Sequence, residues 1–184
     1  MSDILIFARQ VRRRSKEHKL AMTLLCSHQL YGLMVSVLRQ ELDSMVRVIF
    51  LLGQELPIRD KLIADSVYGR KWRIGREQVT DRRMVEFAQE LHGWTASVYK
   101  FGCAFIHLSA LHDYSARDPL QLLPVNERED ILDHCRHYHG GPVNPEAGFR
   151  DLVPFLPNAL KKVADNLDWH LDDLINGRSL EETI

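Results

Sequence analysis

Apolar residues recur every three or four positions along most of the chain, and this spacing is typical of amphipathic helices. The first long run predicts one helix from about Ser15 to Gly53, preceded by a shorter helix from Asp3 to about Arg14. Gly53 and the nearby Pro57 mark its expected end. The apolar positions of this run are Leu20, Leu24, Tyr31, Met34, Leu38, Leu42, Met45, Ile49 and Leu52.

A second long run predicts one continuous helix from Asp81 to Tyr114. Thr80 or Asp81 can cap its start, because either side chain can accept a hydrogen bond from a free backbone amide. The apolar face of this helix consists of Met84, Phe87, Leu91, Trp94, Val98, Phe101, Phe105 and Leu108.

Shorter helices are expected at Ile58 to Tyr68, Asn126 to about Tyr138 and Asn158 to Asn176, with Gly177 as a left-handed cap. Strand-like alternation is essentially absent, and neither a repeat nor an interdomain linker interrupts the pattern. We therefore predict a single all-α domain over residues 1–184, an antiparallel helical bundle with two long helices and shorter C-terminal helices.

Charge is nearly balanced overall but unevenly distributed. The formal net charge of −1 excludes a uniformly basic nucleic-acid-binding protein. Residues 9–19 nevertheless contain six basic residues and one acid, and residues 59–83 contain eight basic residues and four acids. Such segments attract phosphates locally, although solvated helix faces explain them equally well.

The positions of the cysteines indicate a reducing cellular compartment. Cys26, Cys103 and Cys135 lie far apart inside apolar helical patterns, so we expect free thiols and a cytoplasmic protein.

Residues 20–38 carry no charge and approach the length of a membrane span. Polar residues at the midpoint, Ser27 to Gln29, favour a buried core helix instead, and we expect no membrane association.

Arg39, Asp43 and Arg47 form a ladder on one face of the first long helix. At a spacing of four, the acid can pair with both bases. Arg47 lies in a segment that is apolar nearly all round, and a buried guanidinium needs a partner. We therefore expect Arg47 either to pair with Asp43 or to face a cleft, and the sequence leaves both alternatives open.

Lys100 and His107 stand seven residues apart on the second long helix, among small side chains that leave room for a partner or a phosphate. A histidine can act as a base near neutral pH, and a nearby cation stabilises charge that develops on a phosphate. The alternative is a packed histidine and an exposed lysine.

The segment from Lys100 to His107 resembles the signature of bacterial HEPN-type helical domains, which is an Arg followed after four to six residues by a His. The resemblance implies that His107 is the catalytic base and that Lys100 occupies the arginine position. It also implies a homodimer whose two motifs face one another, and RNA cleavage without a metal. The chain departs from the pattern because lysine lacks the planar fork of arginine, and because Phe101 stands where a polar residue is common.

Two histidine-containing segments raise the alternative of metal binding. His112 and Asp113 are similar to the adjacent His-Asp pair of metal-dependent phosphohydrolases, but His92, the candidate upstream ligand, lies about 30 Å away on a continuous helix. A second group spans Asp130 to His139, where helical spacing can offer two ligands to a zinc ion. Its members are Asp130, Asp133, His134, His137 and His139.

The basic loop Arg70, Lys71, Trp72 and Arg73 combines cations with an aromatic ring that can stack on a base. Packing of Trp72 over the end of the bundle is the alternative.

These patterns favour an RNA-directed, HEPN-like homodimer that acts as a metal-independent endoribonuclease and needs no cofactor. In this hypothesis His107 takes a proton from a ribose 2′-hydroxyl, and Lys100, with Arg47 or Arg39, stabilises the phosphate. A non-catalytic interaction module that binds a protein partner, and a metal-dependent phosphohydrolase, are the alternatives.

Overall fold

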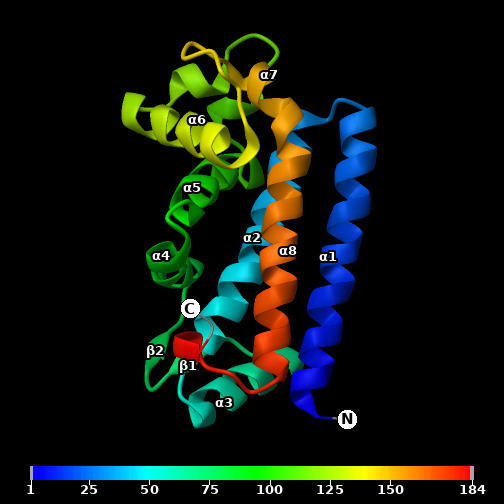
Figure 1. Cartoon of the computed structure of the whole chain (residues 1–184), viewed down its shortest axis with the longest axis vertical. Helices are drawn as coiled ribbons and strands as arrows, with labels where there is room; N and C mark the ends of the chain where they lie inside the picture. The colour runs from blue at the N-terminus through cyan, green and yellow to red at the C-terminus, as the bar shows by residue number, and fades with distance from the viewer. Residues whose placement is uncertain (1, 183–184) are drawn as a thin grey trace.

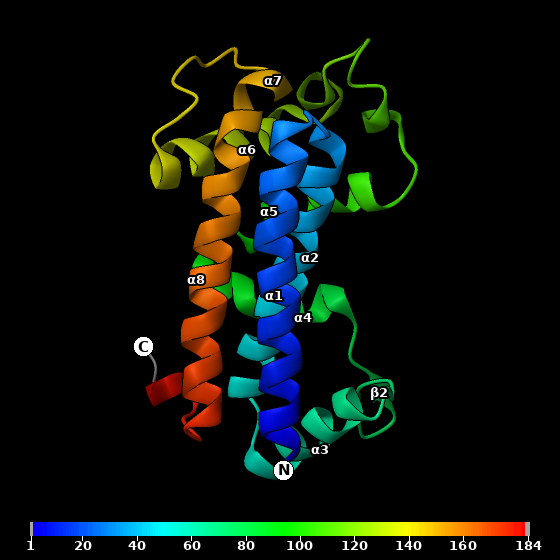
Figure 2. The ribbon, with the colours of Figure 1, turned by 90° about the vertical axis from the view of Figure 1, so that its right-hand side faces the viewer.

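Three helices run side by side along the long axis of the molecule in a computed structural model that describes residues 2–182 (Figures 1 and 2). They are α1 (Asp3–Ser27), α2 (Tyr31–Leu52) and α8 (Leu156–Ile175). The other α-helices are α3 (Leu56–Val67), α4 (Asp81–His92), α5 (Thr95–Ile106), α6 (Val125–His139) and α7 (Phe149–Leu152). Short 3-10 turns occur at η1 (Ala110–His112), η2 (Pro119–Leu122), η3 (Val153–Phe155) and η4 (Leu180–Glu182). The prediction of an all-α bundle is therefore confirmed.

The first predicted long helix is two helices, so its expected bounds are wrong. α1 is continuous through Arg14, and the chain turns between Ser27 and Tyr31. Gln29 adopts a left-handed backbone conformation with φ of 57°, and the Leu30 amide donates to the Leu25 carbonyl at 2.9 Å. Because glutamine rarely adopts this conformation, the sequence carries no glycine signal for the turn.

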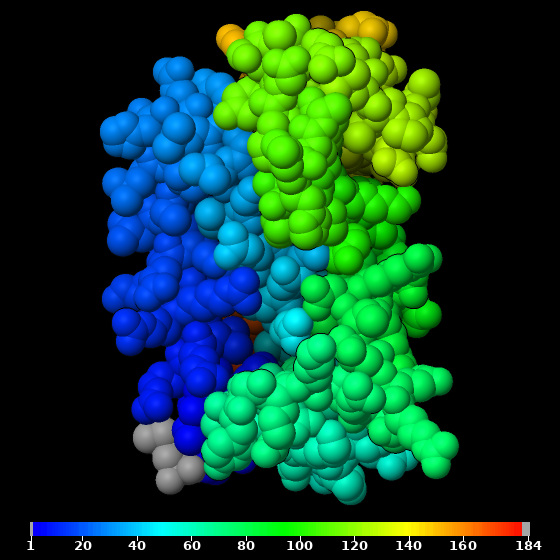
Figure 3. Space-filling model, turned by 180° about the vertical axis from the view of Figure 1, so that it is seen from behind, coloured from blue at the N-terminus to red at the C-terminus, as the bar shows by residue number. Residues whose placement is uncertain are grey.

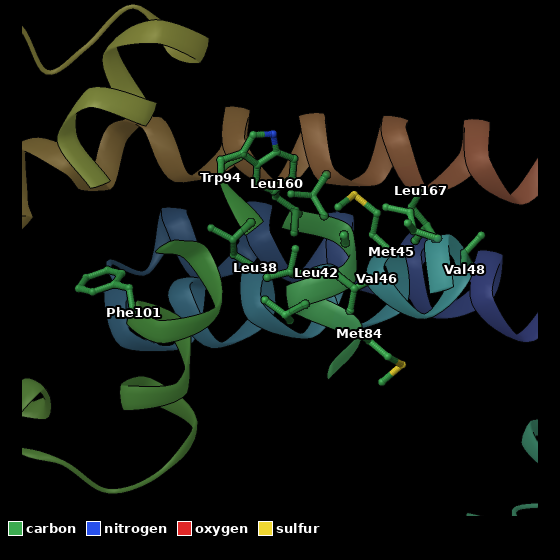
Figure 4. Packing of buried hydrophobic residues seen from close by; sticks show 14 of the residues in the cluster. Leu38, Leu42, Met45, Val46, Val48, Met84, Trp94, Phe101, Leu160 and Leu167 are labelled. Carbon is green, nitrogen blue, oxygen red and sulfur yellow. The ribbon is translucent and has the colours of Figure 1, made fainter. Parts of the chain in front are cut away.

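α2 is the central helix and is buried on nearly every side, as its apolar composition predicts. It packs against α1, α3, α4, α5 and α8. Figure 4 shows Leu38, Leu42 and Met45 of α2 facing the side of α8 that carries Leu160 and Leu167. All five side chains are buried in a single hydrophobic cluster.

A polar group lies inside the contact between α1 and α2. The Glu41 carboxylate is fully buried, accepts a hydrogen bond from the Ser15 hydroxyl and contacts His18 Nδ1 at 2.5 Å. A buried carboxylate is costly unless it is paired, and these two contacts satisfy both of its oxygens. They also fix the register of α1 against α2.

At the end of the bundle opposite α6, the fold is closed by α3 and a hairpin of two short antiparallel strands. The strands are β1 (Arg73–Ile74) and β2 (Glu77–Gln78). β1 begins at Arg73, the last residue of the predicted basic loop. The turn of the hairpin contains Gly75, whose φ of 59° suits glycine. Arg59 of α3 is buried and donates to the carbonyls of Leu51 and Leu52, each at 3.0 Å, which caps the end of α2.

The second predicted long helix is also interrupted. Gly93 has a φ of 66° and ends α4, and α5 begins two residues later in a different direction (Figure 1). Gln89 stabilises the break, because its side-chain oxygen accepts from the Ala96 amide at 2.8 Å and from the Thr95 hydroxyl at 2.9 Å. The predicted cap is confirmed at the other end, where Thr80 accepts from the Arg83 amide at 3.3 Å.

The C-terminal half matches its predicted helices closely. α6 starts at Val125, one residue earlier than expected, and Pro124 occupies the cap position. α8 ends at Ile175, and Gly177 adopts the expected left-handed conformation with φ of 73°. Across residues 2–182, none of the helices has the length and apolar character needed to cross a bilayer.

Candidate functional site

Lys100 lies within α5, and His107 stands at the end of this helix, an end that the sequence did not indicate. α5 ends at Ile106, and His107 follows in an extended conformation with ψ of 144°. His107 caps α5, and its amide still donates to the Cys103 carbonyl at 3.2 Å, so the predicted helix ends at His107 and does not continue to Tyr114. Lys100 and His107 are both exposed, and no polar contact joins them in the described part of the chain.

Lys100 faces α6 across a polar groove. Its Nζ lies 3.5 Å from a Glu127 carboxylate oxygen. The groove has a volume of about 280 Å³, and Gln89, Asp130 and His134 also line it. We call this space the outer groove. The two acids make it a poor receptor for phosphate unless they are protonated or displaced.

Arg39 is buried at the contact of α2 with α5. Its guanidinium pairs with Asp43 and lies 4.0 Å from the centre of the Tyr99 ring. Burial, the largest influence, raises the pKa of Asp43, although the Arg39 charge opposes this. Gly102 allows the approach, because a Cβ atom there would lie 2.5 Å from the Arg39 Cβ. Arg39 therefore holds two helices together and does not face an open cleft.

Arg47 pairs with α4 and not with Asp43. Its Nη2 donates to Asp81 at 2.9 Å, and its guanidinium lies 5.2 Å from the centre of a Trp72 ring. Because Asp81 opens α4, this contact fixes the position of the helix. The structure thus places Arg39, Arg47 and Lys100 in three separate ion pairs.

The basic loop lies at the end of the bundle opposite α6 (Figure 1). Trp72 is buried, stacks on Phe50 with ring centres 6.4 Å apart, and donates from Nε1 to the Ser66 hydroxyl at 2.9 Å. Packing over the end of the bundle, the alternative interpretation, is what the structure shows for this ring. Lys71 and Arg73 remain exposed, and Arg70 is held at 2.7 Å from Asp65.

The two metal-binding hypotheses gain no geometric support. Within residues 2–182 there is no group of three or more His, Cys, Asp or Glu side chains placed to hold an ion. Asp133 pairs with Arg136 at 2.7 Å, and His137 packs edge-on against Tyr138. His134 of the same helix turns inward instead, and its buried Nδ1 has no hydrogen-bond partner.

A second cavity lies behind the outer groove and was not evident in the sequence. It has a volume of about 80 Å³ and is lined by side chains of α2, α5, α6 and α8. Leu38, Trp94, Phe101 and Leu156 give it apolar walls. His134 lines both spaces, so it stands in the wall between them. We call this space the inner cavity.

A histidine pair joins α4 to α8 near this region. His92 Nε2 lies 3.1 Å from His170 Nε2, so one ring donates to the other. His170 is fully buried, and burial lowers its pKa to about 4, with the neighbouring His92 adding to the effect. Burial also lowers the pKa of His92. Both rings are therefore neutral near pH 7.

An apolar surface is exposed where α1 turns into α2 and where α5 ends. We call it the leucine surface. Its members, each between 42% and 94% exposed, are Leu20, Leu24, Leu30, Leu33, Ile106 and Leu108. Figure 3 shows the segment after α5 lying against the start of α2 on this face, where the Ser36 hydroxyl donates to the Phe105 carbonyl at 2.9 Å. The sequence placed Leu20 and Leu24 in a buried core helix, and their exposure shows that this expectation is wrong for both.

Comparisons with known proteins add no relative. The chain matches no family model, no curated protein and no solved structure.

Proposed function

We propose that this protein is a non-catalytic helical interaction module of HEPN-like type that works as a homodimer. One observation supports this above the others: six large apolar side chains are exposed at one end of the bundle. Large apolar side chains exposed near one another are a mark of protein–protein contact. Arg39, Arg47 and Lys100 are each paired with an acidic residue. Because their charges are already compensated, a binding role is favoured over a catalytic one.

The surface suits a second copy of the same chain. Leu20 and Leu24 lie one helical turn apart on α1, so they present a narrow apolar stripe. Leu30 and Leu33 are exposed at the start of α2, after the turn that follows α1. In a two-fold dimer such a stripe packs against its own copy, since the same patch serves both partners.

The test is the mass of the protein in solution. We expect light scattering after size-exclusion chromatography to give twice the chain mass of 21.3 kDa. The double variant Leu20→Glu, Leu24→Glu should elute as a monomer with unchanged helicity, because both side chains are exposed. Leu56→Glu is the matched control, since Leu56 is similarly exposed on α3 at the other end. A monomeric wild type, or a double variant that stays dimeric, contradicts the proposal.

Endoribonuclease activity is a second candidate function, and it is favoured by the position of His107. This exposed residue lies between Ile106 and Leu108 of the leucine surface. A dimer through that surface brings two copies of the imidazole toward each other, as the HEPN resemblance implies. The test is cleavage of labelled RNA in EDTA by wild type, His107→Ala and the exposed control His137→Ala. If dimeric wild type is inert, catalysis is rejected and the interaction module stands.

A further inference from the structure

The inner cavity is small, largely apolar and partly open to solvent. Most of its lining is apolar, and Lys162 and His139 are polar residues at its wall. An engineered apolar cavity of about 150 Å³ accommodates benzene. A volume of about 80 Å³ therefore fits a smaller apolar group, on the order of three or four carbon atoms.

A cation without a matching acid stands at this cavity. Lys162 of α8 lines it, is half-buried, and places its Nζ 3.4 Å from the centre of the Tyr138 ring. No carboxylate lies within ion-pair distance of Lys162 among the residues that the structure describes. The adjacent Lys161 shows the contrast, because it pairs with Asp165 at 2.5 Å. Burial lowers the pKa of Lys162, which reflects the cost of holding this charge away from water.

The surroundings of Lys162 are basic and not acidic. Burial, followed by the nearby Lys162 charge, lowers the pKa of both His139 and His92. His139 lines the cavity beside Lys162, and the unpartnered Nδ1 of His134 lies in the wall. A half-buried cation of this kind is stabilised by an anion that brings its own apolar group into the cavity.

We propose that the inner cavity binds a short-chain monocarboxylic acid of four or five carbon atoms, with its carboxylate on Lys162 and its alkyl group between α2, α5, α6 and α8. The apolar walls select the alkyl group, and the lone ammonium selects a single negative charge. A dianion such as a phosphate monoester is disfavoured, because one lysine cannot compensate two charges in a partly buried site.

The probe is isovalerate, titrated into the full chain and followed by the indole N–H signal of Trp94, which lines the cavity. We expect a dissociation constant on the order of 1 mM, from burial of a small alkyl group and one charge-assisted hydrogen bond. The neutral analogue 3-methylbutan-1-ol should bind about tenfold more weakly. Octanoate should also bind more weakly, because its chain exceeds the cavity.

Three variants separate binding from folding. Lys162→Met should weaken isovalerate binding about tenfold, whereas the matched Lys161→Met should leave it unchanged. Ala159→Leu should abolish binding while the protein stays folded, because Ala159 lines the cavity and the larger side chain fills it. Absence of saturable binding up to about 20 mM, or equal affinity in Lys162→Met, overturns the proposal. Tighter binding of octanoate overturns the size assignment.

Discussion

The stability of this protein should fall in mild acid because of one buried histidine. His170 is fully buried, and its pKa is about 4 in the folded chain against an ordinary value of 6.5. As the pH falls, His170 therefore binds a proton below about pH 6.5 in the unfolded chain but only below about pH 4 in the folded chain. The free energy of unfolding is highest above pH 6.5, declines as the pH drops toward 4, and levels off below that.

The size of this effect follows from the shift in pKa. Each pKa unit corresponds to about 1.4 kcal/mol, so the full loss from His170 is about 3 kcal/mol. Between pH 7 and pH 5 the loss is about 2 kcal/mol, since the folded chain still resists protonation at pH 5. Losses of this size are a large fraction of the stability of a typical domain.

The assay is urea unfolding of wild type and His170→Gln at several values between pH 5 and pH 7. The amide of glutamine can still contact His92 but does not titrate. We expect the wild type to lose about 2 kcal/mol more than the variant over this range. The exposed histidine variant His28→Gln serves as the control and should follow the wild type. Equal pH dependence in wild type and His170→Gln would refute the reasoning, as would an NMR titration of His170 near pH 6.5.

Three further outcomes are expected from the packing. Gly102→Ala should lower the free energy of unfolding by about 2 kcal/mol, measured by urea denaturation, because the new Cβ meets the Arg39 side chain. Gly93→Ala should cost only about 1 kcal/mol in the same assay, since the site is open and only its left-handed conformation resists a side chain. Exposed Cys26 should react first with iodoacetamide at neutral pH, whereas Cys135 should stay unlabelled by mass spectrometry until the protein unfolds, because burial raises its pKa to about 11.

Local sequence signals account for much of this fold. Thr80 and Gly177 mark helix ends through their own backbone and side-chain chemistry, and both lie where that chemistry predicts. The turn at Gln29 has no such signal, because tertiary packing holds a residue in a conformation that it rarely adopts. The break at Gly93 could have been predicted, since glycine often ends a helix, but the apolar spacing continues across it and indicated one continuous helix.

The candidate site was less predictable, for a physical reason. Lys100 and His107 were related by assuming one helix from Asp81 to Tyr114, and the chain instead leaves α5 at His107, so the predicted spacing fails for every residue after it. The acidic partner of Arg47 is Asp81, which lies 34 positions later in the sequence, so spacing within one helix could not indicate it. The inner cavity requires side chains from four helices, so neither spacing nor composition along any one of them reveals it.

The central position of α2 has a consequence for how the protein opens. Because five other helices pack on it, its amide hydrogens can reach solvent only when the whole bundle comes apart. Hydrogen exchange in α2 should therefore report the global free energy of unfolding, while the hairpin should exchange through small local motions. A fragment that retains α2 but lacks α8 would expose apolar side chains of α2 to water and should precipitate.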